Sequence, residues 1–188
     1  MSKVSIINKA LTLLAANRIV DLSDETLEAR TANAVYDQSL KTILSETCWS
    51  FATKRALLNR LEEVPVVGGG FYFEKPSDCI EIFGTTAKEW RPEGSKIWAA
   101  DAELGVLYTY LNDDDTFYSP QFTRAFTYLL AADMCYYITN SASRTQELLS
   151  LYEGEFLPRA LHQDASRQGE TTAIDDEWIN AAEGKIKW

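Results

Sequence analysis

Few side chains in this sequence are suited to covalent chemistry. A cysteine nucleophile needs a neighbouring base, and the 188 residues contain one histidine, His162, and three widely spaced cysteines, Cys48, Cys79 and Cys135. His162 lies in a polar stretch, so we predict a solvated surface histidine rather than a catalytic base. Cys48 and Cys135 lie in apolar helical stretches and are expected to be small core residues. An odd number of cysteines without close spacing implies no disulfide framework.

Two motifs share only part of the pattern of a ligand-binding loop. Residues 113–115 are consecutive aspartates, whereas a calcium-binding EF-hand loop needs alternating oxygen ligands, a central glycine and a distal glutamate. Residues 68–70 are glycines, but neither a Lys-Ser/Thr pair nor a helix follows them, as a phosphate-binding loop requires. We therefore predict a solvated acidic loop and a hairpin connection, with no metal and no cofactor.

Asp133 lies inside a stretch of otherwise apolar helical residues. A carboxylate that is buried there must be paired or hydrogen-bonded. We expect a structural bond to an arginine or to a backbone amide, and a catalytic role is the alternative. No set of residues in the sequence therefore forms a recognisable catalytic centre.

The composition is that of an ordinary globular protein, with 46% hydrophobic and 24% charged residues. No apolar run is long enough to span a bilayer: the best candidate, residues 125–138, is short and contains Asp133. No continuous apolar core follows the N-terminal residues 1–4, so we expect no signal peptide and an intracellular protein.

The chain is acidic, with a formal net charge of −10. Gripping duplex DNA requires clustered lysine and arginine that displace counterions, so an ordinary nucleic-acid-binding surface is not expected. A wall that DNA must slide past, in contrast, benefits from negative charge, because it offers the phosphates no attraction. The charge is compatible both with indifference to DNA and with a surface that lets DNA pass.

Helical periodicity dominates the N-terminal part of the chain. Ser2 is the expected N-cap of a first helix that ends at Asn17, and Ser23 is the expected N-cap of a second helix. The short link between them predicts an antiparallel helical hairpin. The two apolar stripes are Val4, Ile7, Leu11 and Leu14, then Ala29, Ala32, Tyr36, Leu40 and Ile43.

The C-terminal half predicts two more helices. Ser119 and Pro120 fit the N-cap and the first position of a third helix, which is apolar on most sides and therefore expected to be central and buried. Ser143 and Gln146 fit a capping box for a fourth helix. Pro158 lies inside that helix and predicts a kink or a break, because its ring would clash with the carbonyl four residues earlier.

The middle of the chain predicts short strands separated by turns. Val106, Tyr108 and Tyr110 share one face of the last strand. We expect one small antiparallel sheet that is supported by the helices or by a neighbouring subunit, with part of its aromatic excess at an interface. The expected strands are residues 54–61, 71–73, 80–83, 96–99 and 106–110, with turns at residues 67–70, 75–78 and 91–94.

The predicted fold class is α+β, with an extended C-terminal tail. A helical bundle from both chain ends comprises residues 1–50 and 116–165, a small antiparallel β insertion comprises residues 51–115, and the tail comprises residues 166–188. A polar tail that carries isolated aromatic residues favours docking on a partner. Its candidate partner-interface residues are Trp178, Ile179 and Trp188.

A series of short motifs follows in a fixed order from about Val4 to Phe156. They are Ile7-Asn8, Ala10-Leu11, Leu14-Ala15-Ala16, Ile19, Leu22, Asp24, Thr26, Glu28-Ala29, Trp49 with Phe51-Ala52, Pro76 with Asp78-Cys79, Ser119-Pro120 with Phe122, Leu130-Ala131-Ala132 and Ile138-Thr139-Asn140-Ser141. Their order and spacing resemble phage tail tubular protein A, the head-to-tail adaptor (gatekeeper) family of short-tailed, podovirus-like phages. The chain departs from the family where Ala15 replaces an expected glycine, and the tail after Ala165 matches no family motif.

This resemblance implies a structural virion protein without enzymatic activity. Members of the family form a twelve-subunit ring below the portal protein, and the tail nozzle, tail tubular protein B, attaches beneath the ring. Genome DNA passes through the lumen without specific binding. For this chain, the resemblance implies a head-tail connector that is assembled in the host cytoplasm, contacts no membrane and directs its C-terminal segment toward the portal.

Two other interpretations are compatible with the sequence. One is a phage assembly chaperone or head-completion protein, and the other is a hydrolase that uses a cysteine or an aspartate. A ring former should associate, at least on binding the portal, whereas a chaperone should leave the mature particle. An enzyme should lose activity when His162, Asp133 or a cysteine is replaced.

Overall fold

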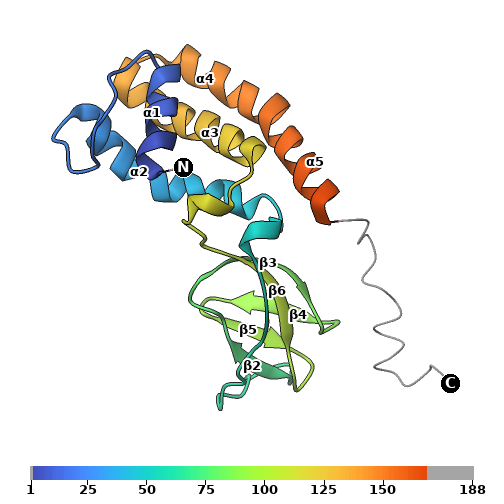
Figure 1. Ribbon diagram of the computed structural model, residues 1–188. Coiled ribbons are helices and arrows are strands. Elements are labelled where there is room, and N and C mark those ends of the chain that lie inside the picture. Colours follow the sequence, from blue (N-terminus) through green and yellow to red (C-terminus); the bar gives the residue numbers. More distant parts are fainter. Residues whose placement is uncertain (1, 169–188) are drawn as a thin grey trace.

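The computed structural model describes residues 2–168 of the chain. Helices predominate, and the strands form two small antiparallel sheets, which confirms the predicted α+β class. The helices occupy one end of the molecule and the sheets occupy the other (Figure 1). The last helix extends to Gln168, so residues 166–168 of the predicted tail are helical, and the rest of that tail lies outside the described residues.

The central element is α3 (Pro120–Thr139), which is buried on most of its surface, as predicted. Its start also confirms the prediction: the Ser119 hydroxyl accepts a hydrogen bond from the N–H of Phe122 at 3.1 Å. Pro120 occupies the first turn, where the helix needs no backbone donor. An apolar helix with both a cap and a proline at its start thus becomes the centre of the fold.

Two N-terminal helices, α1 (Lys3–Leu13) and α2 (Leu27–Ser45), bury their predicted faces against α3. Every residue of the two predicted apolar stripes is buried except Val4, which is partly buried. The two helices pack mainly against α3 and contact each other much less, through Lys3 and Asp37 at 3.1 Å, so the predicted antiparallel hairpin is wrong (Figure 1). The apolar stripes of α1 and α2 are both buried against the large apolar surface of α3 instead of against each other.

The first helix ends before Asn17, the predicted end, because the chain turns at Ala15. Ala15 has a left-handed backbone conformation, with φ of 55°. The N–H of Ala16 donates to the carbonyl of Leu11 at 3.0 Å. The N–H of Ala15 donates to the carbonyl of Thr12 at 3.1 Å, which completes a Schellman motif. An alanine therefore holds the position that usually favours glycine.

The N-cap of α2 is Thr26, whose hydroxyl accepts from the N–H of Ala29 at 3.2 Å. The predicted cap, Ser23, is wrong. Its hydroxyl donates to the carboxylate of Asp21 at 2.6 Å, within a turn in which Asp24 also accepts backbone N–H groups. These local side-chain bonds hold Ser23 outside the helix.

The fourth helix, α4 (Ala142–Leu151), has Ser141 as its N-cap. The predicted capping box of Ser143 and Gln146 is wrong, since both residues lie inside the helix. Asn140 ends α3 in a left-handed conformation with φ of 52°. That sharp reversal lets the next helix restart earlier than the sequence pattern indicates.

The regular helix is interrupted just before Pro158, in agreement with the predicted kink or break, but the chain remains helical. A π-helical turn, Tyr152–Phe156, separates α4 from α5 (Leu157–Gln168). The N–H of Leu157 donates to the carbonyl of Tyr152, five residues earlier. This wider turn accommodates a proline that has no N–H to donate and whose ring crowds an α-helical carbonyl.

The middle of the chain forms two three-stranded antiparallel sheets, whereas the sequence predicts one. The sequence pattern does not reveal β4, because Pro92 is typical of a turn; this proline lies in an edge strand, where it is tolerated. The first sheet has the order β1 (Thr53–Leu57), β6 (Gly105–Tyr110), β3 (Cys79–Thr85), and the second has the order β2 (Phe71–Glu74), β5 (Lys96–Ala99), β4 (Trp90–Glu93).

The sheets share a second hydrophobic core, separate from that of the helices. Phe73 and Ile97 are register partners on β2 and β5, and both are almost fully buried. Val106 and Tyr108 enter the same core from β6, and Tyr110 packs against it. The predicted common face of β6 is therefore confirmed.

A buried carboxylate lies where the chain passes from the helices to the sheets. Asp164 of α5 accepts from the N–H of Ser50 at 3.0 Å and from the Ser50 hydroxyl at 2.6 Å. Ser50 begins the short 3-10 turn η1 (Ser50–Ala52), through which the chain passes from the helices into β1. The neighbouring Trp49 is buried, and its ring N–H donates to the carbonyl of Ile43 at 2.7 Å. The last helix is thus fastened where the chain enters the sheets.

Candidate interaction surfaces

The nucleophilic residues have structural surroundings. The sulfur atoms of Cys48 and Cys135 lie 3.2 Å and 3.4 Å from threonine hydroxyls, and Cys135 is buried in the helical core as predicted, whereas Cys48 is only partly buried. Burial raises the pKa of the Cys79 thiol, which disfavours the reactive thiolate. His162 is exposed on α5, as predicted. None of these contacts prepares a cysteine for attack.

Asp133 is bonded to a neighbouring helix. The hydroxyl of Ser39, on α2, donates to its carboxylate at 2.5 Å, so the partner is neither the arginine nor the backbone amide that we predicted. Burial raises the pKa of Asp133, and the hydrogen bond from Ser39 acts in the opposite direction. The two side chains tie α2 to α3 inside the bundle.

The aspartates at residues 113–115 organise the short turn η2 (Asp115–Phe117) before α3. Asp114 accepts from the N–H of Thr116 at 3.0 Å and from its hydroxyl at 2.6 Å. These bonds, the one from the hydroxyl first, lower the pKa of Asp114. Among residues 2–168, no group of three or more histidine, cysteine, aspartate or glutamate side chains is placed to hold a metal ion.

Residues 61–70, within the connection between β1 and β2, expose apolar side chains and are called the valine loop below. Val64, Val66 and Val67 are 67%, 99% and 81% exposed. Their neighbours Glu62 and Glu63 are also exposed. A group of exposed aliphatic side chains beside charged ones is typical of a protein interaction site. The sequence signal for it is an apolar run, Val-Pro-Val-Val, that belongs to no periodic helix or strand.

The base of the valine loop is held firmly. The ring N–H of Trp98 donates to the carbonyl of Gly69 at 2.8 Å. Gly70 has φ of 80°, and a β-carbon there would lie 2.6 Å from the carbonyl oxygen of Ala99. Lys96 forms an ion pair with Glu63. The glycine run is therefore a shaped hairpin connection whose valines are presented to solvent from a fixed base.

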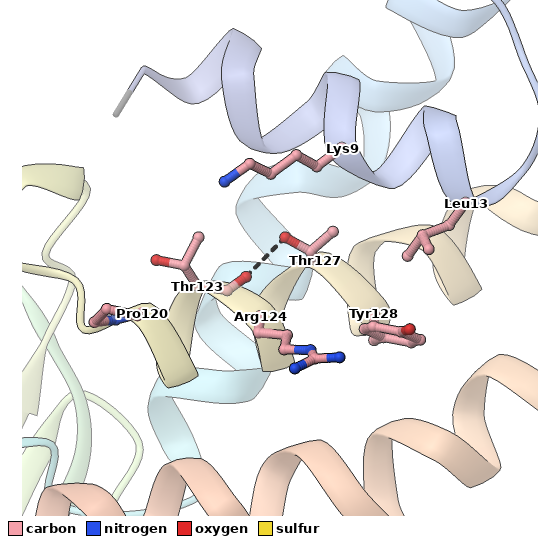
Figure 2. A pocket seen from close by; sticks show the side chains of 7 residues that line it. All are labelled: Lys9, Leu13, Pro120, Thr123, Arg124, Thr127 and Tyr128. Atoms are coloured by element: carbon pink, nitrogen blue, oxygen red, sulfur yellow. Dashed lines mark hydrogen bonds between the residues drawn. The ribbon is translucent and has the colours of Figure 1, made fainter.

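A groove of about 420 Å³ lies between α1 and α3 and is called the basic groove below (Figure 2). Among residues 2–168, the side chains that line it include two cations and no acid. Its residues are Lys9, Leu13, Pro120, Thr123, Arg124, Thr127 and Tyr128.

The walls of the basic groove are fixed by contacts within the bundle. The Thr127 hydroxyl donates to the carbonyl of Thr123 at 2.7 Å (Figure 2). The ring of Tyr128 stacks on Phe156 with a centroid separation of 4.0 Å. The guanidinium of Arg124 lies 4.6 Å from the centre of the same Phe156 ring, and Arg124 as a whole residue is exposed. The groove thus offers apolar walls with positive charge on its rim.

Two tyrosines form a smaller exposed site near the end of α3. Tyr136 and Tyr137 are 54% and 68% exposed, and their ring centroids lie 6.5 Å apart. The predicted partner-interface residues Trp178, Ile179 and Trp188 lie outside the described residues. The surfaces that the structure offers are therefore ones that the sequence pattern did not single out.

Comparison with known proteins gives no relative from which a role could be transferred. No protein-family model matches the sequence. No curated protein matches it either. Within residues 2–168, none of the helices combines the length and the apolar character that a bilayer crossing demands.

Proposed function

We propose that this chain is a structural subunit of a phage head-to-tail connector. It forms a ring between the portal protein and the tail nozzle, and the genome passes through the ring. The order of motifs that resembles the tail tubular protein A family motivates this assignment. Its residues work by contact with copies of the chain and with neighbouring virion proteins, and not by catalysis.

The valine loop is the observation that carries the proposal. Three valines that are at least two-thirds exposed stand on a loop whose base is fastened by Trp98. A free monomer gains nothing by holding apolar side chains in water, whereas a subunit that buries them on assembly gains stability. The contacts of the cysteines and of Asp133, in contrast, support packing rather than a reaction.

The finer arrangement in this proposal is a helical bundle from both chain ends, a β insertion and an extended tail that docks on a partner. Trp178, Ile179 and Trp188 would provide the tail contacts with the portal. The net charge of −10 per copy suits a channel lining, since a ring of such subunits repels the phosphates of passing DNA. The twelve copies of the family are the expected number.

Light scattering tests the proposal directly. The mass of the full chain is measured alone and after mixing with a candidate portal protein, and electron microscopy shows whether particles of higher mass are rings. Rings, alone or on the portal, support the connector. A chain that stays monomeric in both samples, or that is absent from purified virions, contradicts it.

A truncation separates the role of the tail from that of the bundle. Deleting everything after Ala165 should leave the unfolding transition nearly unchanged and weaken binding to the portal. Binding equal to that of the full chain would exclude tail docking. A hydrolase would reveal itself differently, by turnover that disappears in His162→Ala or Asp133→Asn.

A further inference from the structure

The basic groove is unusual for this protein. The chain has 28 acidic and 18 basic residues, yet the seven lining residues found in the described part of the chain include Lys9 and Arg124 and no acid. Leu13 and Tyr128 add apolar surface. A segment that combines carboxylates with aliphatic side chains would complement both properties.

The valine loop has that composition. Glu62 and Glu63 precede the apolar residues 64–67, and both residues are exposed. Glu63 forms the ion pair with Lys96 at the base of the loop, so Glu62 is the carboxylate that faces a partner. Val66 is 99% exposed and is the most accessible of the large apolar side chains in the described chain. Because Trp98 and Gly70 fix the base of the loop, little conformational freedom is lost when its tip binds.

We propose that the valine loop of one copy of this chain docks in the basic groove of a neighbouring copy. The valine side chains contact the wall formed by Leu13 and Tyr128, and the carboxylate of Glu62 approaches the guanidinium of Arg124. This contact deepens the proposed function and rests on it, because it would be the interface between successive subunits of the ring.

The placement of the two surfaces requires a second chain. The valine loop precedes β2 at the sheet end of the molecule, whereas α1 and α3 lie at the helical end (Figure 1). A loop at one end therefore does not reach the groove of its own chain. Two different surfaces that complement each other give a head-to-tail contact, which closes into a ring when the rotation between subunits permits.

The test uses the full chain and three single variants in light scattering over a range of concentrations. Val66→Asp changes the loop, Arg124→Glu changes the groove, and Val20→Asp is the control, since Val20 is 89% exposed and lines neither surface. We expect the first two variants to weaken self-association by about tenfold or more, as hot-spot residues do, and the control to behave as the wild type. Thermal unfolding of each variant verifies that it is folded.

A charge exchange makes the test specific. The double variant Glu62→Lys with Arg124→Glu reverses the charge on both sides of the contact, so it should recover much of the association that Arg124→Glu alone loses. Wild-type rings that persist in both Val66→Asp and Arg124→Glu would overturn the docking while leaving the connector proposal intact. A wild-type chain that is monomeric at every concentration would also overturn the docking, and the portal mixture would then decide the connector proposal.

The competing interpretation is that the two cations of the basic groove, Lys9 and Arg124, bind a phosphate group. Titration with a duplex oligonucleotide distinguishes it, because groove binding to phosphate would be lost in Arg124→Glu and kept in Val66→Asp. That pattern would overturn the docking of the loop. No binding of the duplex by the wild type, together with the rescue by charge exchange, supports the contact between copies.

Discussion

Replacing Ala15 by glycine should make the protein more stable. Ala15 lies in the left-handed region with φ of 55°, where an L side chain costs about 1–2 kcal/mol relative to glycine. Glycine gives the unfolded chain more freedom, which offsets about 0.5–1 kcal/mol. The side chain of Ala15 is exposed, so the substitution removes no core contact. The expected net gain is about 0.5–1 kcal/mol.

Urea unfolding followed by tryptophan fluorescence measures this gain. For a chain of this size, about 1 kcal/mol raises the melting temperature by about 2–4 °C, so thermal unfolding gives a second measure. Asn140→Gly is the matched comparison: its φ of 52° is similar, but asparagine tolerates this conformation, so the gain should be smaller. An Ala15→Gly variant that is equal to or less stable than the wild type would refute the assigned strain.

Four further substitutions test named contacts by the same unfolding measurements. Asp164→Ala should lower the free energy of unfolding by about 2–3 kcal/mol, because the N–H and hydroxyl at the start of η1 lose a charged, buried acceptor. Thr26→Ala should cost about 1 kcal/mol through the lost N-cap of α2, whereas Ser23→Ala should change stability by less than about 0.5 kcal/mol. Asp133→Asn should stabilise the protein at pH 7, since burial raises the pKa of this carboxyl and penalises its charged form, while the amide oxygen still accepts from Ser39.

The pH dependence of the Asp133→Asn effect follows from the direction of that shift. A carboxyl whose pKa is higher in the folded state binds its proton more tightly there, so stability falls as the pH rises from the unfolded value through the folded one. The advantage of the asparagine should therefore be full above the folded pKa and should vanish below about pH 4, where Asp133 is protonated in both states. An advantage that does not change with pH would exclude ionisation as its cause.

Local chemistry in the sequence was sufficient to predict individual elements. The cap at Ser119, the proline at the start of α3 and the buried stripes of α1 and α2 were found where the pattern placed them. The strand at residues 96–99 agrees with the prediction residue for residue. Each of these signals depends on neighbours within one or two turns of chain, so the sequence contains it in full.

The two wrong N-cap predictions, Ser23 and Ser143, lie where more than one nearby residue is suited to cap the helix. Ser23 and Ser143 are as suitable for capping as Thr26 and Ser141, and the sequence does not rank them. The hydrogen bond between Ser23 and Asp21 excludes Ser23 as the N-cap of α2, and the left-handed turn at Asn140 places Ser141 at the N-cap of α4. Serine and threonine side chains stabilise either a cap or a nearby turn, and the surrounding chain decides which.

Tertiary structure alone decided which distant residues meet. Asp164 reaches Ser50 across 114 positions, Trp98 fastens the valine loop at Gly69, and the basic groove exists because α1 lies against α3. Periodicity shows that one face of a helix or strand is apolar, but it does not show which other element covers that face. The reason is that the hydrophobic free energy depends on the buried area and has no direction. The sequence therefore determined the elements, their buried faces and the net charge of −10, while the packing of α3 and the pairing of six strands into two sheets created the surfaces available to partners.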